Sequence, residues 1–424
     1  MGSRIGVVGT GYVGLTTGAC LAHLGHEVVC FDTDLPKIER LRRGIVPIRE
    51  PGLDELVAEG LASGRLAMCD EPARAWDREF TFLCLPTPSA PDGTADLGAL
   101  RAACAAVGPH LPGGSVVVAK STVPVGSLAD VRRWLGRTDV AVAANPEFLR
   151  EGSAVGDWLA PDRVVVGADD VDVAERVAAL YDGIDRPLVL TDPRSAQLAK
   201  YGANALLATR LSFVNGLAAL CRAVDADPAA VLEAMALDAR IGGHHLEPGP
   251  GWGGSCFPKD LDALRALARE LDVPFGLLDE AAAMNRARIE AVADGVLACL
   301  AGPSHRPTVA VWGLTFKAGT DDLRDSPAVG VIAHFRRHDV YVRAHDPMVP
   351  PGSHIVDAGV EVVDDPYEAC AGAGALAVLT GWPDYRDVDL ERVAACLGHG
   401  AVIDTRGVID RTAVERAGLV WRPV

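Results

Sequence analysis

The stretch Arg4-Ile5-Gly6-Val7-Val8-Gly9-Thr10-Gly11-Tyr12-Val13-Gly14 decides the fold of the first half of the chain. Its apolar run predicts a strand, glycines follow at the spacing G-x-G-x-x-G, and an Ala- and Leu-rich helical stretch then reaches Gly25. The next apolar run, Glu27-Val28-Val29-Cys30-Phe31-Asp32, predicts a second strand that ends in an acid. This order and spacing are typical of a dinucleotide-binding unit.

The same unit indicates which dinucleotide is bound. The pyrophosphate would rest on the N-terminus of the first helix, and Asp32 would accept a hydrogen bond from the ribose 2′-hydroxyl group. Because a 2′-phosphate would meet the Asp32 carboxylate, the sequence favours NAD over NADP. Lys37 either flanks the adenosine or is an ordinary solvated helix residue.

Composition indicates a globular chain of two or three domains. The 424 residues are 49% hydrophobic and 23% charged, as in folded proteins. A formal net charge of −17, without a run of basic residues, argues against nucleic acid or an anionic membrane as partner. We expect no membrane helix and no signal peptide, and therefore a cytoplasmic protein. Ten cysteines without a C-x-x-C pair fit a reducing compartment.

Further apolar runs alternate with helical patterns and predict a doubly wound parallel sheet. The runs are Phe80–Leu85, Ser115–Ala119, Val140–Ala144 and Arg163–Gly167. Ligands of such sheets bind beyond the carboxyl ends of the strands, and polar clusters follow there: Pro86-Thr87-Pro88, Lys120-Ser121-Thr122, and Asn145-Pro146-Glu147-Phe148-Leu149-Arg150-Glu151-Gly152. Glu147 and Glu151 are four residues apart, so one helical turn would place them on one face, as a functional pair or as two solvated acids.

The middle of the chain combines a long helical pattern with a glycine-rich thiol loop. Apolar residues recur at helical spacing from Ser195 through Leu220, and Lys200 and Asn204 would project from one face of this helix. The loop is Gly251-Trp252-Gly253-Gly254-Ser255-Cys256-Phe257-Pro258-Lys259-Asp260. A helix that begins at Pro258 would direct its positive end at Cys256 and favour a nucleophilic thiolate.

A buried structural cysteine is the alternative for Cys256. The nine other cysteines lie in apolar or Ala-rich surroundings, whereas Cys256 stands among glycines and charged residues. Lysine usage points the same way, because only five of the 40 basic residues are lysine: Lys37, Lys120, Lys200, Lys259 and Lys317. We interpret these lysines as positions that need a compact ammonium group rather than any positive charge.

A second strand-turn unit is expected after a boundary at Gly302-Pro303. Its strands are predicted at Thr308–Gly313, Val340–Asp346, Ala375–Leu379 and Ala401–Asp404. Because this half lacks G-x-G-x-x-G, we expect it to hold a different nucleotide-like ligand, with Lys317 and Arg406 as contacts. His244 and His245 have no third ligand at suitable spacing, so no metal is expected.

Together these motifs resemble the UDP-glucose/GDP-mannose dehydrogenase family over nearly the whole chain. The motifs are GTGYVG (9–14), STVPVG (121–126), NPEFLREG (145–152), PDRVVVG (161–167), GGSCFPKD (253–260) and GLTFKAGTDDLRDSP (313–327). The resemblance implies two Rossmann-like α/β domains with doubly wound parallel sheets, joined by a central helical dimerisation region. Residues 1–190 would bind NAD, 191–300 would carry the cysteine loop and form a homodimer, and 301–424 would bind a sugar nucleotide.

The resemblance also implies a four-electron oxidation of the C6 alcohol of an NDP-glucose, with release of two NADH. Cys256 would hold the aldehyde as a thiohemiacetal and then as a thioester, which water hydrolyses. Lys200 and Asn204 would stabilise the oxyanion, and Asp260, Thr122 and Glu147 would position and activate the water.

The remaining site residues follow from the resemblance as well. The NAD contacts would be Gly9, Gly11, Tyr12, Val13 and Gly14 of the glycine turn, with Asp32, Lys37, Thr87, Thr122, Glu151, Lys259 and Arg324. The substrate contacts would be Phe148, Leu149, Arg150, Glu151, Lys200, Asn204, Arg240, His245, Leu246, Glu247, Pro248, Gly249, Gly253, Lys317 and Arg406, with Arg240 reaching across a dimer.

The chain departs from the family pattern at several positions: Ala119, Gly216, His244, His245, Trp252 and Thr405. These positions lie nearer the sugar nucleotide than the thiol, so UDP-glucose and TDP-glucose both remain candidate substrates. Two other functions stay open, namely a single-oxidation dehydrogenase of the hydroxyacid kind, which needs no thiol, and a protein that senses NAD without turnover.

Overall fold

The structure is a computed structural model that describes residues 2–71, 76–300, 307–353, 355, 359–397 and 400–423. The boundary expected at Gly302-Pro303 lies outside the described residues. The chain forms two compact units: Met1–Ala203 with Asp262–Leu267, and Asn204–Leu261 with Ala268–Val424. The limits predicted for three domains stay a proposal.

The first unit is built on an eight-stranded sheet in the order β3-β2-β1-β4-β5-β6-β7-β8. Its strands are β1 (Arg4–Val8), β2 (Glu27–Phe31), β3 (Leu66–Cys69), β4 (Phe80–Leu83), β5 (Val116–Ala119), β6 (Ala141–Ala144), β7 (Val164–Ala168) and β8 (Leu188–Thr191). The strands from β3 to β6 are parallel, which confirms the predicted doubly wound sheet.

Two strands of this sheet run against the expectation, because β7 is antiparallel to β6 and β8 is parallel to β7. The connection between β6 and β7 contains only the six-residue helix α7 (Ala154–Leu159). A parallel neighbour needs a crossover that returns the chain to the amino end of the sheet, whereas an antiparallel neighbour needs no such return.

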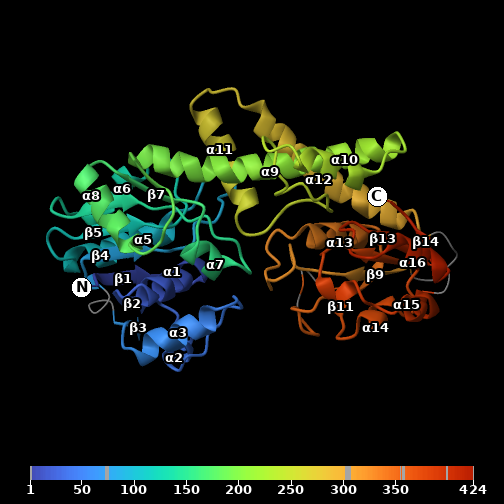
Figure 1. The fold of residues 1–424 in the computed structure, drawn as a ribbon, viewed down its shortest axis with the longest axis horizontal. Helices are drawn as coiled ribbons and strands as arrows, with labels where there is room; N and C mark the ends of the chain where they lie inside the picture. The colour runs from blue at the N-terminus through green and yellow to red at the C-terminus, as the bar shows by residue number, and fades with distance from the viewer. Residues whose placement is uncertain are drawn as a thin grey trace. The chain divides into compact units, whose positions relative to one another are not determined.

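Helices cover both faces of the sheet in the first unit (Figure 1). They are α1 (Tyr12–His23), α2 (Leu35–Arg42), α3 (Leu53–Ala62), α5 (Gly98–Val107), α6 (Leu128–Leu135), α7 and α8 (Val171–Ala178), with the 3-10 turns η1 (Gly108–His110) and η2 (Ala179–Tyr181). One apolar cluster packs α1 and α3 against the sheet, and another packs α5 and α6. The central strands are therefore buried on both sides and their sequences are almost wholly apolar.

The second unit contains a six-stranded parallel sheet in the order β11-β10-β9-β12-β13-β14. Its strands are β9 (Thr308–Trp312), β10 (Tyr341–His345), β11 (Val360–Val362), β12 (Ala375–Val378), β13 (Ala401–Asp404) and β14 (Val420–Trp421). The surrounding helices are α13 (Pro327–Arg337), α14 (Pro366–Cys370), α15 (Leu390–Leu397) and α16 (Arg411–Arg416), with η3 (Pro383–Tyr385). The chain thus has two parallel-sheet α/β domains.

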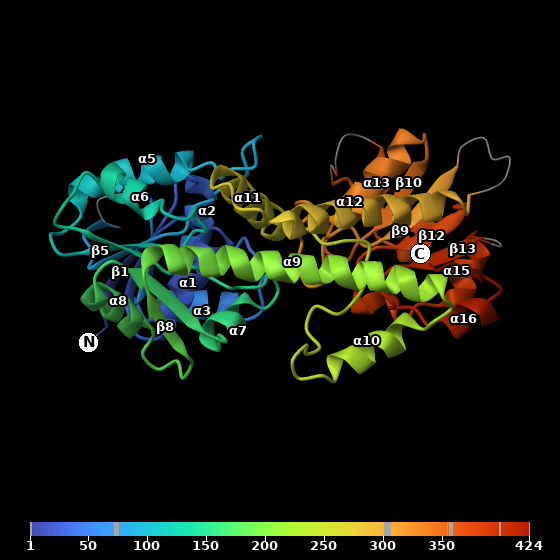
Figure 2. The ribbon, with the colours of Figure 1, turned by 90° about the horizontal axis from the view of Figure 1, so that it is seen from above.

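The central region is helical and contains α9 (Pro193–Ala223), α10 (Pro228–Ala236), α11 (Phe257–Glu270) and α12 (Gly276–Leu297). Figure 2 shows α9 as one unbroken helix, and its 31 residues are long and apolar enough for a membrane span by length and composition. No such stretch is expected from the sequence. Lys200, Asn204 and Ser212 of α9 are buried and bonded to protein groups, so we infer a core helix.

Candidate active site

The glycine turn after β1 has the shape that a dinucleotide requires. Gly9 has φ 95°, and a Cβ atom there would lie 2.4 Å from the carbonyl oxygen of Cys84. A Cβ on Gly14 would lie 1.9 Å from the carbonyl oxygen of Gly9, whereas a Cβ on Gly11 would meet nothing within 4 Å. Gly9 and Gly14 therefore permit the tight turn and close packing, and Gly11 leaves open space where a pyrophosphate can approach.

Asp32 stands at the carboxyl end of β2, beside this turn. Its Oδ2 accepts hydrogen bonds from the backbone N–H and the hydroxyl of Thr10, at 2.8 and 2.7 Å, and contacts Lys37 Nζ at 2.7 Å. Burial alone would raise the pKa of Asp32, but Lys37 and these donors lower it to about 2. Lys37 is thus not an ordinary solvated residue, and its contact with adenosine stays a prediction.

The segment after β6 is not helical, so the helical turn expected to stack Glu147 and Glu151 is wrong. Residues 145–150 form neither helix nor strand, and residues 151–152 form a turn before α7. The physical reason is Pro146, which disfavours a helical conformation at Asn145, together with the Glu147 carboxylate, whose Oε2 accepts from the N–H of Leu149 at 2.6 Å.

Glu147 and Lys200 form a buried ion pair, with 3.1 Å between Oε1 and Nζ and side chains 7% and 3% exposed. Burial alone would raise the pKa of Glu147, but Lys200, the Leu149 N–H and Lys120 lower it below its ordinary value. Lys120 is held behind the pair by Asn145 Oδ1 and Tyr181 OH, at 2.9 and 3.1 Å. Glu147 is therefore an anion at neutral pH.

Thr122 and Lys200 line the same small cavity of the first unit, together with Ser121 and Gln197. The Thr87 hydroxyl donates to the carbonyl oxygen of Thr122 at 2.9 Å and fixes the backbone there. The loops after β4 and β5 thus meet as the sheet topology predicts.

In the second unit, Cys256 immediately precedes α11, as the sequence predicted. In the first turn of that helix, the N–H of Asp260 donates a hydrogen bond to the carbonyl oxygen of Cys256 at 3.0 Å. Cys256 is partly exposed, as are Cys299 and Cys396, while the other seven cysteines are buried. The positive end of α11 favours an anion at this position.

Asp260 lies one turn into α11 and is 1% exposed. Its Oδ2 accepts from Asn204 Nδ2 at 2.6 Å, and its Oδ1 contacts Lys259 Nζ at 2.5 Å. Asn204 is in turn one helical turn from Lys200 along α9. The structure therefore places an amide, a carboxylate and an ammonium group around the start of the thiol helix.

The glycines of the thiol loop are needed for close packing. A Cβ on Gly253 would lie 1.8 Å from the carbonyl oxygen of Asp325, and one on Gly254 (φ 84°) would lie 2.8 Å from the Phe316 ring. The atypical Trp252 is buried, with its Nε1 donating to Ser212 Oγ at 2.8 Å. These contacts fix the loop that carries Cys256.

A cationic pocket of the second unit includes part of the predicted substrate set, namely Glu247, Pro248, Lys317 and Arg406. Four further arginines in its lining were not predicted from the sequence, namely Arg222, Arg288, Arg386 and Arg411. Burial lowers the pKa of Arg288 to about 10, with further lowering by Arg222 and Arg406, and burial also lowers the pKa of Arg406 to about 10. Guanidinium groups gathered in this way are suited to a polyanion.

Gly249 ends the predicted substrate loop His245–Gly249, of which Glu247 and Pro248 line this pocket. Its carbonyl oxygen accepts from Arg288 Nε at 2.8 Å, and its N–H donates to Asn215 Oδ1 at 2.8 Å. A Cβ on Gly249 would lie 2.6 Å from Arg406 Nη1. Nearby, Leu246 is buried in a small apolar cluster and His245 (φ 57°) places its ring 6.3 Å from that of Phe257.

Three predicted arginine contacts are held by neighbouring acids. Arg150, Arg240 and Arg324 pair with Asp157, Asp238 and Asp322, respectively. Phe148, beside Arg150, lies under the Arg163 guanidinium at 3.5 Å. The ligand contacts of these residues, and those of Glu151, stay predictions. Among the described residues, no group of three His, Cys, Asp or Glu side chains could hold a metal ion.

Comparison with known proteins gives matches along the chain to one family, the UDP-glucose/GDP-mannose dehydrogenase family. Residues 3–185 match its NAD binding domain, residues 194–287 its central domain and residues 310–411 its UDP binding domain. A UDP-glucose 6-dehydrogenase of Rhizobium meliloti is 41% identical over 99% of both chains. The UDP-glucose 6-dehydrogenase TuaD of Bacillus subtilis is 37% identical over 99% of this chain and 93% of its own.

Solved structures agree with these sequence matches. A UDP-glucose dehydrogenase from Pyrobaculum islandicum superposes with a TM-score of 0.91 at 35% identity, covering 100% of this chain and 97% of its own.

Proposed function

The chain belongs to the UDP-glucose/GDP-mannose dehydrogenase family, and from that premise we propose that it oxidises the C6 alcohol of UDP-glucose to a carboxylate at Cys256. Its cofactor is NAD, which when bound accepts one hydride in each of two oxidations. The open side of Gly11 and the Asp32 carboxylate suit this cofactor. The observation that carries the proposal is a partly exposed thiol at the positive end of α11, one turn from the buried Asp260.

The proposed chemistry proceeds through two covalent states of Cys256. After the first hydride and the alcohol proton have left, the thiolate adds to the C6 aldehyde and forms a C–S bond. The carbonyl oxygen then carries a negative charge, which Lys200 and Asn204 are suited to stabilise from adjacent turns of α9. Departure of the second hydride converts this thiohemiacetal into a thioester.

Hydrolysis of the thioester needs an activated water. Glu147, held as an anion beside Lys200, and Asp260, held by Asn204 and Lys259, are the candidate bases. Water adds to the thioester carbonyl, the C–S bond breaks, the thiolate is released and a carboxylate remains. The cationic pocket with Lys317, Arg288 and Arg406 would hold the diphosphate of the sugar nucleotide.

The test is a panel of nucleotide sugars that includes UDP-glucose and TDP-glucose, with NADH followed at 340 nm and the product identified. We expect two NADH per UDP-glucose and no net turnover for Cys256→Ala. Cys299→Ala is the matched control, because Cys299 is also partly exposed.

Other outcomes of the panel would replace the proposal. One NADH per sugar with an active Cys256→Ala variant would indicate a single-oxidation dehydrogenase. Absence of NADH with every sugar would indicate a sensor of NAD. Faster turnover of TDP-glucose would mean that the preferred substrate carries thymine instead of uracil. We further propose that the enzyme is a soluble, cytoplasmic homodimer.

A further inference from the structure

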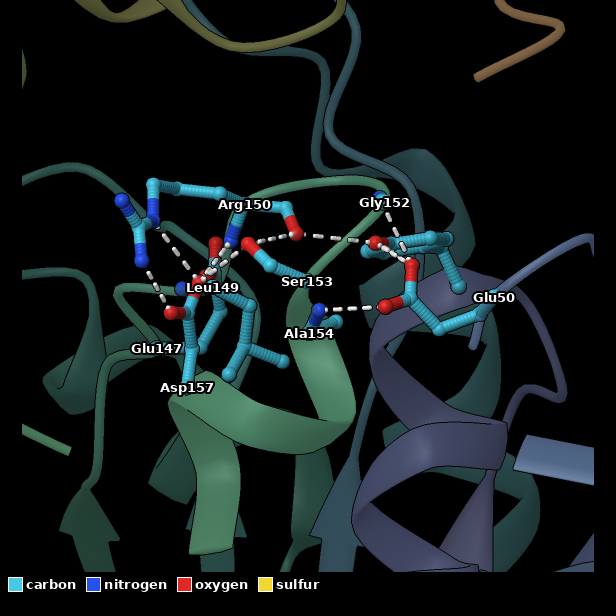
Figure 3. Close-up of polar contacts among 9 residues, drawn as sticks. Glu50, Glu147, Leu149, Arg150, Gly152, Ser153, Ala154 and Asp157 are labelled. Carbon is cyan, nitrogen blue, oxygen red and sulfur yellow. Dashed lines mark hydrogen bonds and ion pairs between the residues drawn. The ribbon is translucent and has the colours of Figure 1, made fainter. Parts of the chain in front are cut away.

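Glu50 is a buried carboxylate that the proposed chemistry does not use. It is 5% exposed and lies just before α3. Its oxygens accept hydrogen bonds from the backbone N–H groups of Gly152 and Ala154, at 2.7 and 2.5 Å (Figure 3), and from the hydroxyl of Tyr12. A carboxylate that receives three donors away from water fixes the groups that donate to it.

The donors belong to segments far apart in the sequence. Tyr12 is the first residue of α1 and part of the G-x-G-x-x-G turn. Gly152 and Ala154 form the start of α7, whose N-cap residue Ser153 makes no side-chain capping bond. Glu50 therefore supplies the cap of α7 from another part of the chain and ties it to the dinucleotide turn.

The loop of residues 145–152, part of the predicted substrate site, also contacts Tyr12. The Tyr12 hydroxyl also contacts the carbonyl oxygen of Arg150 at 3.0 Å. On its other side the loop is held by Arg150 and Asp157, whose Nη2 and Oδ1 atoms are 2.5 Å apart. Within this frame Glu147 keeps its ion pair with Lys200. The start of α1 is thus connected to the loop of residues 145–152 in two ways, directly through the Tyr12–Arg150 contact and indirectly through Glu50.

We propose that Glu50 is a positioning residue that couples dinucleotide binding at residues 9–14 to nucleotide-sugar binding at residues 145–152. The inference rests on the proposed function, because it takes UDP-glucose as the second ligand. Each ligand fixes one end of the Tyr12–Glu50–Gly152 connection, so the first ligand to bind orders the site of the other.

The experiment measures the Kd of NADH by fluorescence titration, with and without saturating UDP-glucose. NADH cannot accept a hydride from the alcohol, so no turnover disturbs the titration. We expect the two Kd values of the wild type to differ by about 5-fold or more, and their ratio to fall toward one in Tyr12→Phe and Glu50→Gln. Because the readout is a ratio within one variant, a uniform loss of NADH affinity cancels.

Tyr341→Phe is the matched control, because it removes a hydroxyl that donates to a glutamate, Glu361, at 2.7 Å elsewhere in the chain. Its ratio should equal that of the wild type. The inference would be overturned by a wild-type ratio of one, or by an unchanged ratio in folded Tyr12→Phe and Glu50→Gln. If the wild type still oxidises UDP-glucose, the proposed function is unaffected by either result. A wild type that does not oxidise UDP-glucose would remove both.

Discussion

At the scale of single residues, we propose that Asp32 determines the choice of cofactor. Its carboxylate is fixed beside the glycine turn by Thr10 and Lys37, so a ribose hydroxyl can donate to it but a 2′-phosphate is repelled. We expect Asp32→Ser to lower kcat/KM for NAD by about 10-fold or more, the order of one hydrogen bond to a charged group, and to improve the use of NADP. Steady-state kinetics with both cofactors test this, and an unchanged NAD:NADP preference would contradict it.

The ionisation of Asp32 should also appear in the pH dependence of stability. Its pKa is lowered from 3.8 to about 2 in the folded protein, so the unfolded state binds the proton more tightly. The stabilisation from the carboxylate is therefore present above about pH 4 and is lost as the pH falls toward 2. We expect the difference in unfolding free energy between wild type and Asp32→Asn to shrink between pH 6 and pH 2.5 in urea titrations. A constant difference would contradict this.

Arg288 should contribute to binding of the diphosphate rather than of the nucleoside. It lies in the cationic pocket and orients Gly249. We expect Arg288→Gln to weaken UDP binding by about 10-fold, as for loss of a charged hydrogen bond, and to leave uridine binding nearly unchanged in calorimetric titrations. Arg269→Gln is the control, because Arg269 pairs with Asp279 and is 62% exposed. Equal losses for UDP and uridine would argue for a purely structural role.

Residue chemistry explains which of these positions the sequence could reveal. Lysine is rare in this chain, and Lys37, Lys200 and Lys259 each contact a predicted site carboxylate. Arg288 was missed because arginine is the ordinary cation of this protein. Glu50 was missed because its donors lie 38 to 104 residues away and two of them are backbone groups, which no local pattern contains.

At the scale of elements, the thiol loop depends on the absence of a side chain at Gly253. A Cβ there would lie 1.8 Å from the Asp325 carbonyl oxygen, so the loop must shift. We expect Gly253→Ala to cost about 1–3 kcal/mol of unfolding free energy and to lower kcat by about 100-fold through misplacement of Cys256. Gly276→Ala is the control, since a Cβ there meets nothing within 4 Å. Thermal unfolding and initial rates test both variants, and equal behaviour would contradict the argument.

The elements that the sequence predicted well are those fixed by local pattern. The β1–α1–β2 unit has apolar runs, three glycines and an acid at defined spacing, and the structure matches it. The direction of β7 was not predictable in this way, because its apolar run does not distinguish an antiparallel from a parallel neighbour. The irregular form of residues 145–150 was also missed, since the spacing of Glu147 and Glu151 resembles a helix while Pro146 and the Leu149 contact oppose one.

At the scale of the whole molecule, α9 carries an exposed apolar stripe. Leu206, Phe213 and Leu220 are spaced by seven residues and are 67%, 55% and 59% exposed. A seven-residue spacing places these side chains on one face of the helix, and such a face is suited to the same face of a second copy. This stripe supports the proposed homodimer, in which the exposed Arg240 would reach the partner's substrate.

Breaking the stripe should separate the two copies. In a two-fold interface each substitution occurs twice, so Phe213→Asp would introduce two carboxylates into an apolar contact, where neither is paired. We expect the wild type to be a dimer by light scattering after size exclusion and Phe213→Asp to be a folded monomer with a raised KM for UDP-glucose. Leu237→Asp is the control, because Leu237 is 82% exposed but lies outside the stripe. A monomeric wild type, or a Phe213→Asp dimer as tight as the Leu237→Asp dimer, would show that α9 does not form the interface.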